Sequence, residues 1–220
     1  MDPLLSDDLA ILPQGAGLAG GALVGSPVPG QLRIAMIATP YFAIPPAGYG
    51  GAEAVVAELV NGLVERGHHI TLIAAGSHGT RAQRFLASYE IPPGDRLHEA
   101  LPEVIHAACG ARAIEDCDVD VVHDHTLAGP LLARGRLTPT VVTPHSPLDG
   151  ELGSYYRTLG DTVRMVAISA AQRAAAPDLP WTATVHNAVR VATFPLPGRQ
   201  GRLRAISRPV RPRQGTTPGH

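Results

Sequence analysis

The sequence predicts an α/β protein in which a parallel β-sheet is covered by helices on both faces, giving three layers. Two observations support this prediction. Short apolar runs typical of buried parallel strands recur along the chain, and segments with apolar residues at helical spacing separate them. The chain has 220 residues, of which 45% are hydrophobic and 17% charged. This composition suits a globular domain with a substantial core.

The first β-strand is expected at residues 32–38, where LRIAMIA is a short apolar block. A loop rich in proline and glycine follows at 39–51. Residues 52–67 carry apolar side chains at helical spacing, which predicts an amphipathic helix. A second buried strand is expected at 69–76, so that the whole segment forms a strand–helix–strand unit.

The alternation of strands and helices continues through the rest of the predicted domain. The further elements are expected in this order: a helix at 101–116, a strand at 118–126, a short helical stretch to Arg134, a strand at 139–146, a short helix near Tyr155–Leu159, a strand at 163–169, a short helix at 170–176 and a last strand at 182–189. This pattern is typical of a Rossmann-like parallel sheet.

The two ends of the chain differ from its middle. Residues 1–31 carry glycine and proline clusters without a sustained period, so we expect a flexible leader there. The ordered domain is expected at 32–194. Residues 195–220 are rich in arginine, proline and glycine, which predicts a disordered tail. The charge is uneven too, because residues 179–220 hold seven arginines and no acidic residue.

The composition excludes several classes of protein. A net charge of −1 and an aromatic content of 4% argue against nucleic-acid binding. No apolar run is long enough to span a membrane, and no basic residue precedes the mildly apolar stretch 9–29, as a signal peptide would require. Cys109 and Cys117 are too few for a disulfide scaffold, so a cytoplasmic location is expected.

Polar residues follow the predicted strands where those strands end. In a parallel sheet the carboxyl ends of the strands meet at one edge, where ligands bind. The sequence therefore predicts a polar small-molecule site at that edge, although polar residues also begin ordinary loops. The strand-end residues are Thr39, Ser77, His78, His123, Asp124, His125, Thr143, His145, Ser146, Ser169, His186 and Asn187.

Glycines precede the first predicted helix at Gly48, Gly50 and Gly51. They would let a ligand approach the backbone, and the free N–H groups at a helix start favour anions such as a diphosphate. A plain tight turn is the alternative. Glu53 follows at the start of the helix, where an acidic residue is also simply favourable. The loop fits neither the GxGxxG dinucleotide fingerprint nor a P-loop.

The histidines are candidates for the polar site. His123 and His125 are two apart on a strand and share one face, with Asp124 on the other. A third zinc ligand at a defined spacing is missing, so we expect no metal there. His145 lies between Pro144 and Pro147, which would hold its imidazole rigidly at the site. The alternative is that these histidines serve the core or are bonded to the backbone.

Seven motifs in a fixed order resemble the N-terminal half of family 4 glycosyltransferases of the GT-B type. The resemblance covers about Leu32 to Phe194. Such enzymes have two Rossmann-like domains with the active site between them, and the N-terminal domain mainly binds the acceptor. The motifs are RIAMIATP, GYGGAE, ELVNGLVERGHHITLIAAG, DVDVVHDH, VVTPHS, MVAIS and TVHNAV.

The resemblance implies that a sugar is transferred from a nucleotide-sugar donor to an unknown acceptor with retention of configuration, without metal or cofactor. Gly50 and Gly51 would then approach the donor diphosphate, and His145 would be the catalytic histidine facing the reacting sugar. Asn187 would lie on the hinge side, where the family has an Asn-Gly turn and this chain has Ala188. The acceptor-side candidates are Glu53, His123, Asp124, His125 and Ser146.

The chain departs from this family beyond its first half. The family's nucleotide-binding domain carries an Arg/Lys pair and an acidic ExxxxxxxE motif, whereas this chain has no lysine and no acidic residue after Asp178. We therefore expect a truncated or frameshifted product with negligible transferase activity alone. Two alternatives remain: a non-catalytic binding module with a basic tail, and one chain of a two-chain transferase.

Overall fold

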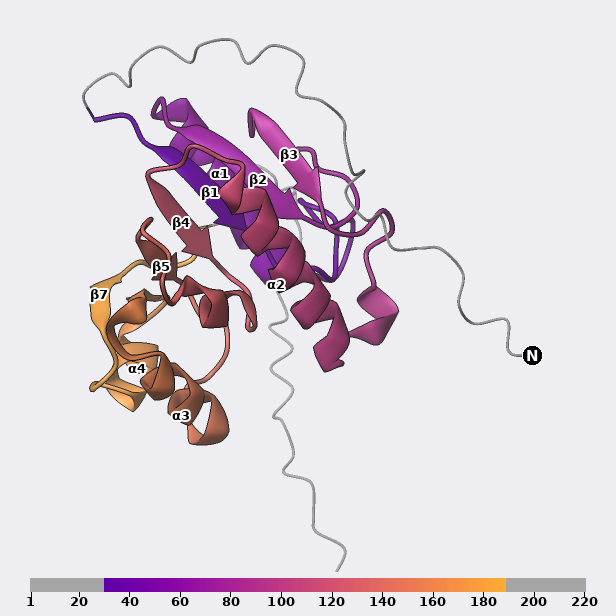
Figure 1. The fold of residues 1–220 in the computed structure, drawn as a ribbon. Helices are drawn as coiled ribbons and strands as arrows, with labels where there is room; N and C mark the ends of the chain where they lie inside the picture. Colours follow the sequence, from indigo (N-terminus) through magenta and orange to yellow (C-terminus); the bar gives the residue numbers. More distant parts are fainter. Residues whose placement is uncertain (1–29, 189–220) are drawn as a thin grey trace, which may run out of the picture. The chain divides into compact units, whose positions relative to one another are not determined.

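The computed structural model describes residues 30–188 (Figure 1). The expected tail at 195–220 and all but the last two residues of the expected leader lie outside this range. Within it, seven strands form a single all-parallel sheet in the order β3-β2-β1-β4-β5-β6-β7. The strands are β1 Arg33–Ile37, β2 His69–Ala74, β3 Arg84–Ala87, β4 Val121–Asp124, β5 Thr140–Val142, β6 Arg164–Ala167 and β7 Trp181–Thr184.

Helices cover both faces of this sheet, which confirms the expected α/β, Rossmann-like architecture. The helix α1 packs through Val56 and Val60 on one face, and α2 packs through Ala113 and Ile114 on the other (Figure 1). The α-helices are α1 Gly51–Glu65, α2 Ala100–Glu115, α3 Gly150–Leu159 and α4 Ala170–Ala175, and the 3-10 turns are η1 Gly94–Arg96, η2 Gly129–Ala133 and η3 Gly160–Thr162.

Alternation along each strand explains how two layers of helices share one sheet. On β1, Met36 packs with the α1 layer, whereas its neighbour Ile37 packs with the α2 layer. The register pairs Ile37 with Asp124 on β4, and Asp124 with Val142 on β5. Val142 packs with α3, so α3 lies on the same face as α2.

Several elements differ in extent from the sequence expectation: β5 and β7 are shorter than the strands expected at 139–146 and 182–189, and α3 begins at Gly150. Strand β3 was not expected, because RFLA is only four residues long and its side chains are half-buried at the sheet edge. The strand expected at 118–126 is shorter, since β4 begins at Val121. The preceding Asp118 and Asp120 instead bind the guanidinium of Arg33, with an Nη2–Oδ1 distance of 2.7 Å to Asp120. This ion pair fixes the start of β1 beside that of β4.

No helix among residues 30–188 is both long and apolar enough to span a lipid bilayer.

Buried histidines should make the stability of this fold depend on pH. His106 on α2 is fully buried, and its Nδ1 lies 2.6 Å from the hydroxyl of Ser88. Burial lowers the pKa of His106 to about 4. The unfolded chain therefore binds a proton at this residue below about pH 6.5 while the folded chain does not, so stability falls as the pH falls from 6.5 to 4.

We expect His106→Gln to remove this contribution while keeping a hydrogen-bonding partner for Ser88. The wild-type free energy of unfolding should fall between pH 7 and pH 5 by about 2 kcal/mol more than that of the variant. Urea denaturation at the two pH values measures the difference. Asp124 opposes the trend equally in both proteins, because burial raises its pKa to about 6. Equal pH slopes in the two proteins would contradict the prediction.

Candidate functional site

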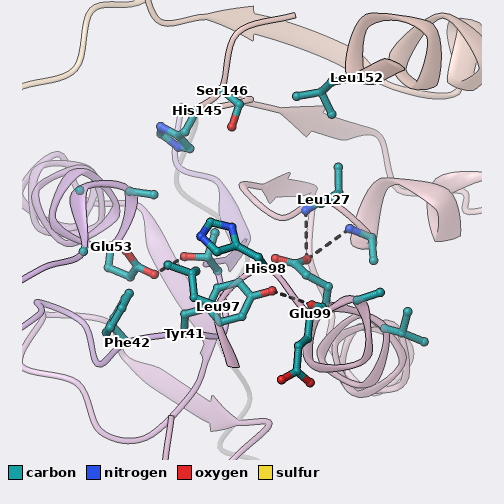
Figure 2. Close-up of a pocket in the computed structure, with 18 of the residues that line it drawn as sticks. Tyr41, Phe42, Glu53, Leu97, His98, Glu99, Leu127, His145, Ser146 and Leu152 are labelled. Atoms are coloured by element: carbon teal, nitrogen blue, oxygen red, sulfur yellow. Dashed lines mark hydrogen bonds between the residues drawn. The ribbon is translucent and has the colours of Figure 1, made fainter. Parts of the chain in front are cut away.

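A pocket of about 1050 Å³ opens at the carboxyl edge of the sheet (Figure 2). Its walls come from the loops after β1, β4, β5 and β7, from residues 97–99 before α2, and from the first turns of α1, α2 and α3. In Figure 2, His145 and Ser146 lie on one side of the pocket and Tyr41 and Phe42 on the other. The pocket therefore lies where the strand-end residues predicted a site.

The glycine loop forms one wall of this pocket. Helix α1 begins at Gly51, and its N-cap Gly50 has a φ of 142°, a conformation that favours glycine. A Cβ at Gly50 would lie 2.8 Å from the Cβ of Pro46. Glu53 follows in the first turn, is only 4% exposed and accepts a hydrogen bond from the hydroxyl of Thr39. Burial raises the pKa of the Glu53 carboxyl.

His145 and Ser146 line the pocket from the loop after β5. The backbone of this loop is held by Gln172 on α4, whose side-chain amide donates to the carbonyls of Pro144 and Ser146 at 3.0 Å each. This role of Gln172 could not be predicted from the sequence, because the residue lies 26 positions after Ser146 in a short alanine-rich helix. The loop geometry therefore depends on a tertiary contact as well as on the two flanking prolines.

Behind His145, outside the pocket lining, lie two further histidines. The Nδ1 of His125 is 2.9 Å from the Nε2 of His145, and the Nε2 of His123 is 2.8 Å from the hydroxyl of Thr143. The rings of His123 and His125 have centroids 4.3 Å apart. Burial lowers the pKa of all three histidines, so the cluster is uncharged at neutral pH.

Asp124 also lies outside the pocket lining, where it shapes the turn after β4. Its Oδ1 accepts from the backbone N–H and the hydroxyl of Thr126 at 2.8 and 2.7 Å. The hydroxyl of Thr126 in turn accepts from the N–H of Gly129 at 3.0 Å. A Cβ at Gly129 would lie 2.2 Å from the Oδ2 of Asp124, so the turn requires glycine.

Of the five acceptor-side candidates, only Glu53 and Ser146 line the pocket.

Glu103 is a pocket residue that sequence reasoning missed. It lies in the first turn of α2, is 7% exposed, and its Oε2 accepts from the backbone N–H groups of Leu127 and Ala128 at 3.1 and 3.3 Å. The bond from Leu127 is drawn in Figure 2. A helix that follows a parallel strand starts at the carboxyl edge of the sheet. The place of Glu103 in the first turn of a predicted helix was therefore the sequence feature that could have identified it as a site residue.

Tyrosine hydroxyls complete the polar framework of the site. Tyr41 donates to the carbonyl of Glu99 at 3.2 Å, and burial raises its pKa to about 12. Tyr155 donates to the carbonyl of Leu127 at 2.5 Å. Asn187, which follows β7, also lines the pocket, as expected for a residue near a strand end. The described part of the chain holds no cluster of three or more His, Cys, Asp or Glu residues suited to a metal ion.

The two adjacent glycines provide a matched test of the loop geometry. We expect Gly50→Ala to destabilise the protein by about 1–3 kcal/mol, because the new Cβ meets Pro46 and the backbone conformation is strained. Gly51→Ala is the control, since a Cβ there has no neighbour within 4 Å. Its stability should stay within about 0.5 kcal/mol of wild type. Urea denaturation measures both, and equal losses would contradict this account.

The contact between His125 and His145 should fix the tautomer of His145. The Nε2 of His125 is buried without a hydrogen-bond partner, and buried N–H groups without a partner are rare. We therefore expect the proton of His125 on Nδ1, donated to His145, which leaves the proton of His145 on its own Nδ1. Imidazole ¹⁵N NMR distinguishes the two tautomers.

Variants separate the hydrogen bond from simple packing. His125→Phe should release His145 into a mixture of tautomers, whereas His125→Asn retains an N–H donor and should preserve the Nδ1–H form. His78→Phe is the control, because His78 bonds Thr80 and does not line the pocket. An unchanged His145 spectrum in His125→Phe would show that the contact does not select the tautomer.

Two comparisons with known proteins found matches to this chain. The profile of Glycosyltransferase Family 4 matches residues 49–173, which is more than half of the chain. Among solved structures, 19 chains match. One is AviGT4, a glycosyltransferase involved in avilamycin A biosynthesis, at 24% identity and a TM-score of 0.47. The alignment covers 74% of this chain but 44% of AviGT4. No curated protein matches. From the family match over residues 49–173, this chain belongs to glycosyltransferase family 4.

Proposed function

We propose that this chain is the acceptor-binding domain of a glycosyltransferase that transfers a sugar, with retention of configuration, from a nucleotide-sugar to an acceptor hydroxyl. The observation that supports this best is the pocket itself. Its lining combines the glycine loop and His145 with Tyr41, Phe42 and the buried carboxylates Glu53 and Glu103. A nucleotide-sugar beside the glycine loop and His145, with an acceptor in the same pocket, would bring the reacting groups together.

On the donor side we propose that Gly50 and Gly51 approach the diphosphate. The N-terminus of α1 presents free N–H groups, and the helix dipole favours a negative charge there. His145 would hydrogen-bond the reacting sugar. Burial lowers the pKa of this histidine, so its ring is neutral and can donate from Nδ1 to the sugar while its Nε2 accepts from His125. Asn187 would lie near the junction with a second domain.

We further propose that the chain alone has negligible transferase activity. Among the described residues that line the pocket there is no arginine, and the whole chain has no lysine. Tight binding of a diphosphate normally uses such cations through charge-assisted hydrogen bonds. The cations for the donor would then come from a second domain, either in a longer chain or in a separate polypeptide.

A domain fusion tests this proposal. Residues 189–220 are replaced by the nucleotide-binding domain of an active family 4 enzyme, and transfer from that enzyme's nucleotide-sugar to a panel of acceptors is followed by mass spectrometry. We expect activity in the fusion and none in the chain alone. His145→Ala in the fusion should lower kcat by about 100-fold or more, whereas His78→Ala should not.

Three results would count against the proposal. Turnover of a nucleotide-sugar by the unfused chain would contradict the claim that it is inactive alone. A folded fusion that binds nucleotide but transfers no sugar to any acceptor would contradict the acceptor-binding role. Full activity of the His145→Ala fusion would remove His145 from the reacting centre.

A further inference from the structure

The charged side chains that line the pocket are mostly acidic. Four carboxylates line it and no arginine does, within the described residues. They are Glu53, Glu99, Glu103 and Glu151. Of these, only Glu99 is paired with a cation, the guanidinium of Arg96 at 2.9 Å. A ligand that carries a phosphate or carboxylate on the acceptor side would therefore meet like charges without compensation.

Glu103 is the most informative of the four carboxylates, because one of its two oxygens has no hydrogen-bond donor among the described residues. Its Oε2 is occupied by the two backbone N–H groups of Leu127 and Ala128. Its Oε1 makes no hydrogen bond to any described residue, although the side chain is more than nine-tenths buried and lines the pocket. Oε1 is not among the fully buried polar atoms without a partner, so it is open to the pocket, where a charged ligand donor would form a charge-assisted hydrogen bond.

A second buried carboxylate lies near the first. Glu53 in the first turn of α1 is buried and lines the same pocket, and its negative charge contributes to raising the pKa of Glu103, after burial itself. Two like charges that are held out of water favour a cation more than they favour a neutral donor. The chain supplies no such cation to the pocket among residues 30–188.

The rim of the same pocket is apolar and exposed. Tyr49, Val104, Leu127 and Leu131 line the pocket, and each is about half exposed or more. Large exposed apolar side chains around one concave site are typical of a surface that contacts an apolar ligand. The ligand that fits both features has a charged donor for the interior and an apolar body for the rim.

We propose that the acceptor of this domain is an amphiphilic amine, with an ammonium group bound to the Oε1 of Glu103 and an apolar or aromatic body on the rim. This inference rests on the proposed function only in calling the pocket ligand the acceptor. Glu103 is thereby a specificity-determining residue that selects for positive charge. Glu53 supports the same selection from the wall formed by α1.

Three probes that differ in charge test the proposal on the full chain. They are octyl β-D-glucosaminide, octyl β-D-glucoside and octyl β-D-glucuronide, each used below its micelle-forming concentration at pH 7. Dissociation constants come from NMR titration. We expect the amine to bind about tenfold more tightly than the neutral glycoside, which corresponds to one charge-assisted hydrogen bond, and the glucuronide to bind least.

The matched variants are Glu103→Gln and Glu115→Gln, which make the same change at opposite ends of α2. The glutamine at 103 keeps an oxygen for the N–H groups of Leu127 and Ala128 but loses the charge, so the tenfold preference should disappear. Glu115 is exposed and outside the pocket, so its variant should keep the preference. If the 103 variant does not fold, Glu53→Gln should reduce the preference in the same direction.

The results that overturn the inference differ from those that overturn the proposed function. Equal binding of the amine and the neutral glycoside, tighter binding of the glucuronide, or an unchanged preference in a folded Glu103→Gln variant each overturns the amine selectivity. None of these measurements uses a nucleotide-sugar. Transfer by the domain fusion to acceptors without an amine would uphold the proposed function and overturn this inference. Amine-selective binding with no transfer would do the opposite.

Discussion

The constraint on which the rest of this structure depends is the common direction of its strands. Because all seven strands are parallel, their carboxyl ends lie along one edge, and each chain connection must cross back over a face of the sheet. This brings Thr39, Glu53, His145 and Asn187 to one pocket although they are distant in the sequence. The interior of each strand can then remain apolar while the loops carry the chemistry.

The chemistry of the pocket is determined by burial as much as by residue type. His145 remains neutral because it is buried against His125, and Glu53 and Glu103 are carboxylates whose charge is disfavoured by burial. Each is held by a fixed partner, namely a second imidazole, a hydroxyl or a pair of backbone N–H groups. Such groups are oriented before a ligand arrives, which lowers the cost of binding.

The contents of the pocket support the acceptor-binding role proposed above. The pocket offers hydrogen-bonding groups, apolar walls and negative charge, which would favour a hydroxylated or amine-bearing acceptor. It offers little to neutralise a diphosphate beyond the backbone at the start of α1. The alignment with AviGT4 covers 44% of that chain. In the function proposed above, a second domain would supply the missing cations.

The sequence by itself determined the fold class, the βαβ unit from β1 to β2, and the convergence of Gly50, Gly51, Glu53, His145 and Ser146, because apolar period and strand direction are local properties of the chain. It did not reveal β3, whose four residues at the sheet edge carry too little apolar signal. Only the tertiary structure decided that His123, Asp124 and His125 lie behind the pocket and that Glu103 lies in it. The reason is that side-chain burial and hydrogen-bond partners depend on the packing of segments far apart in sequence, such as Gln172 against the loop of His145.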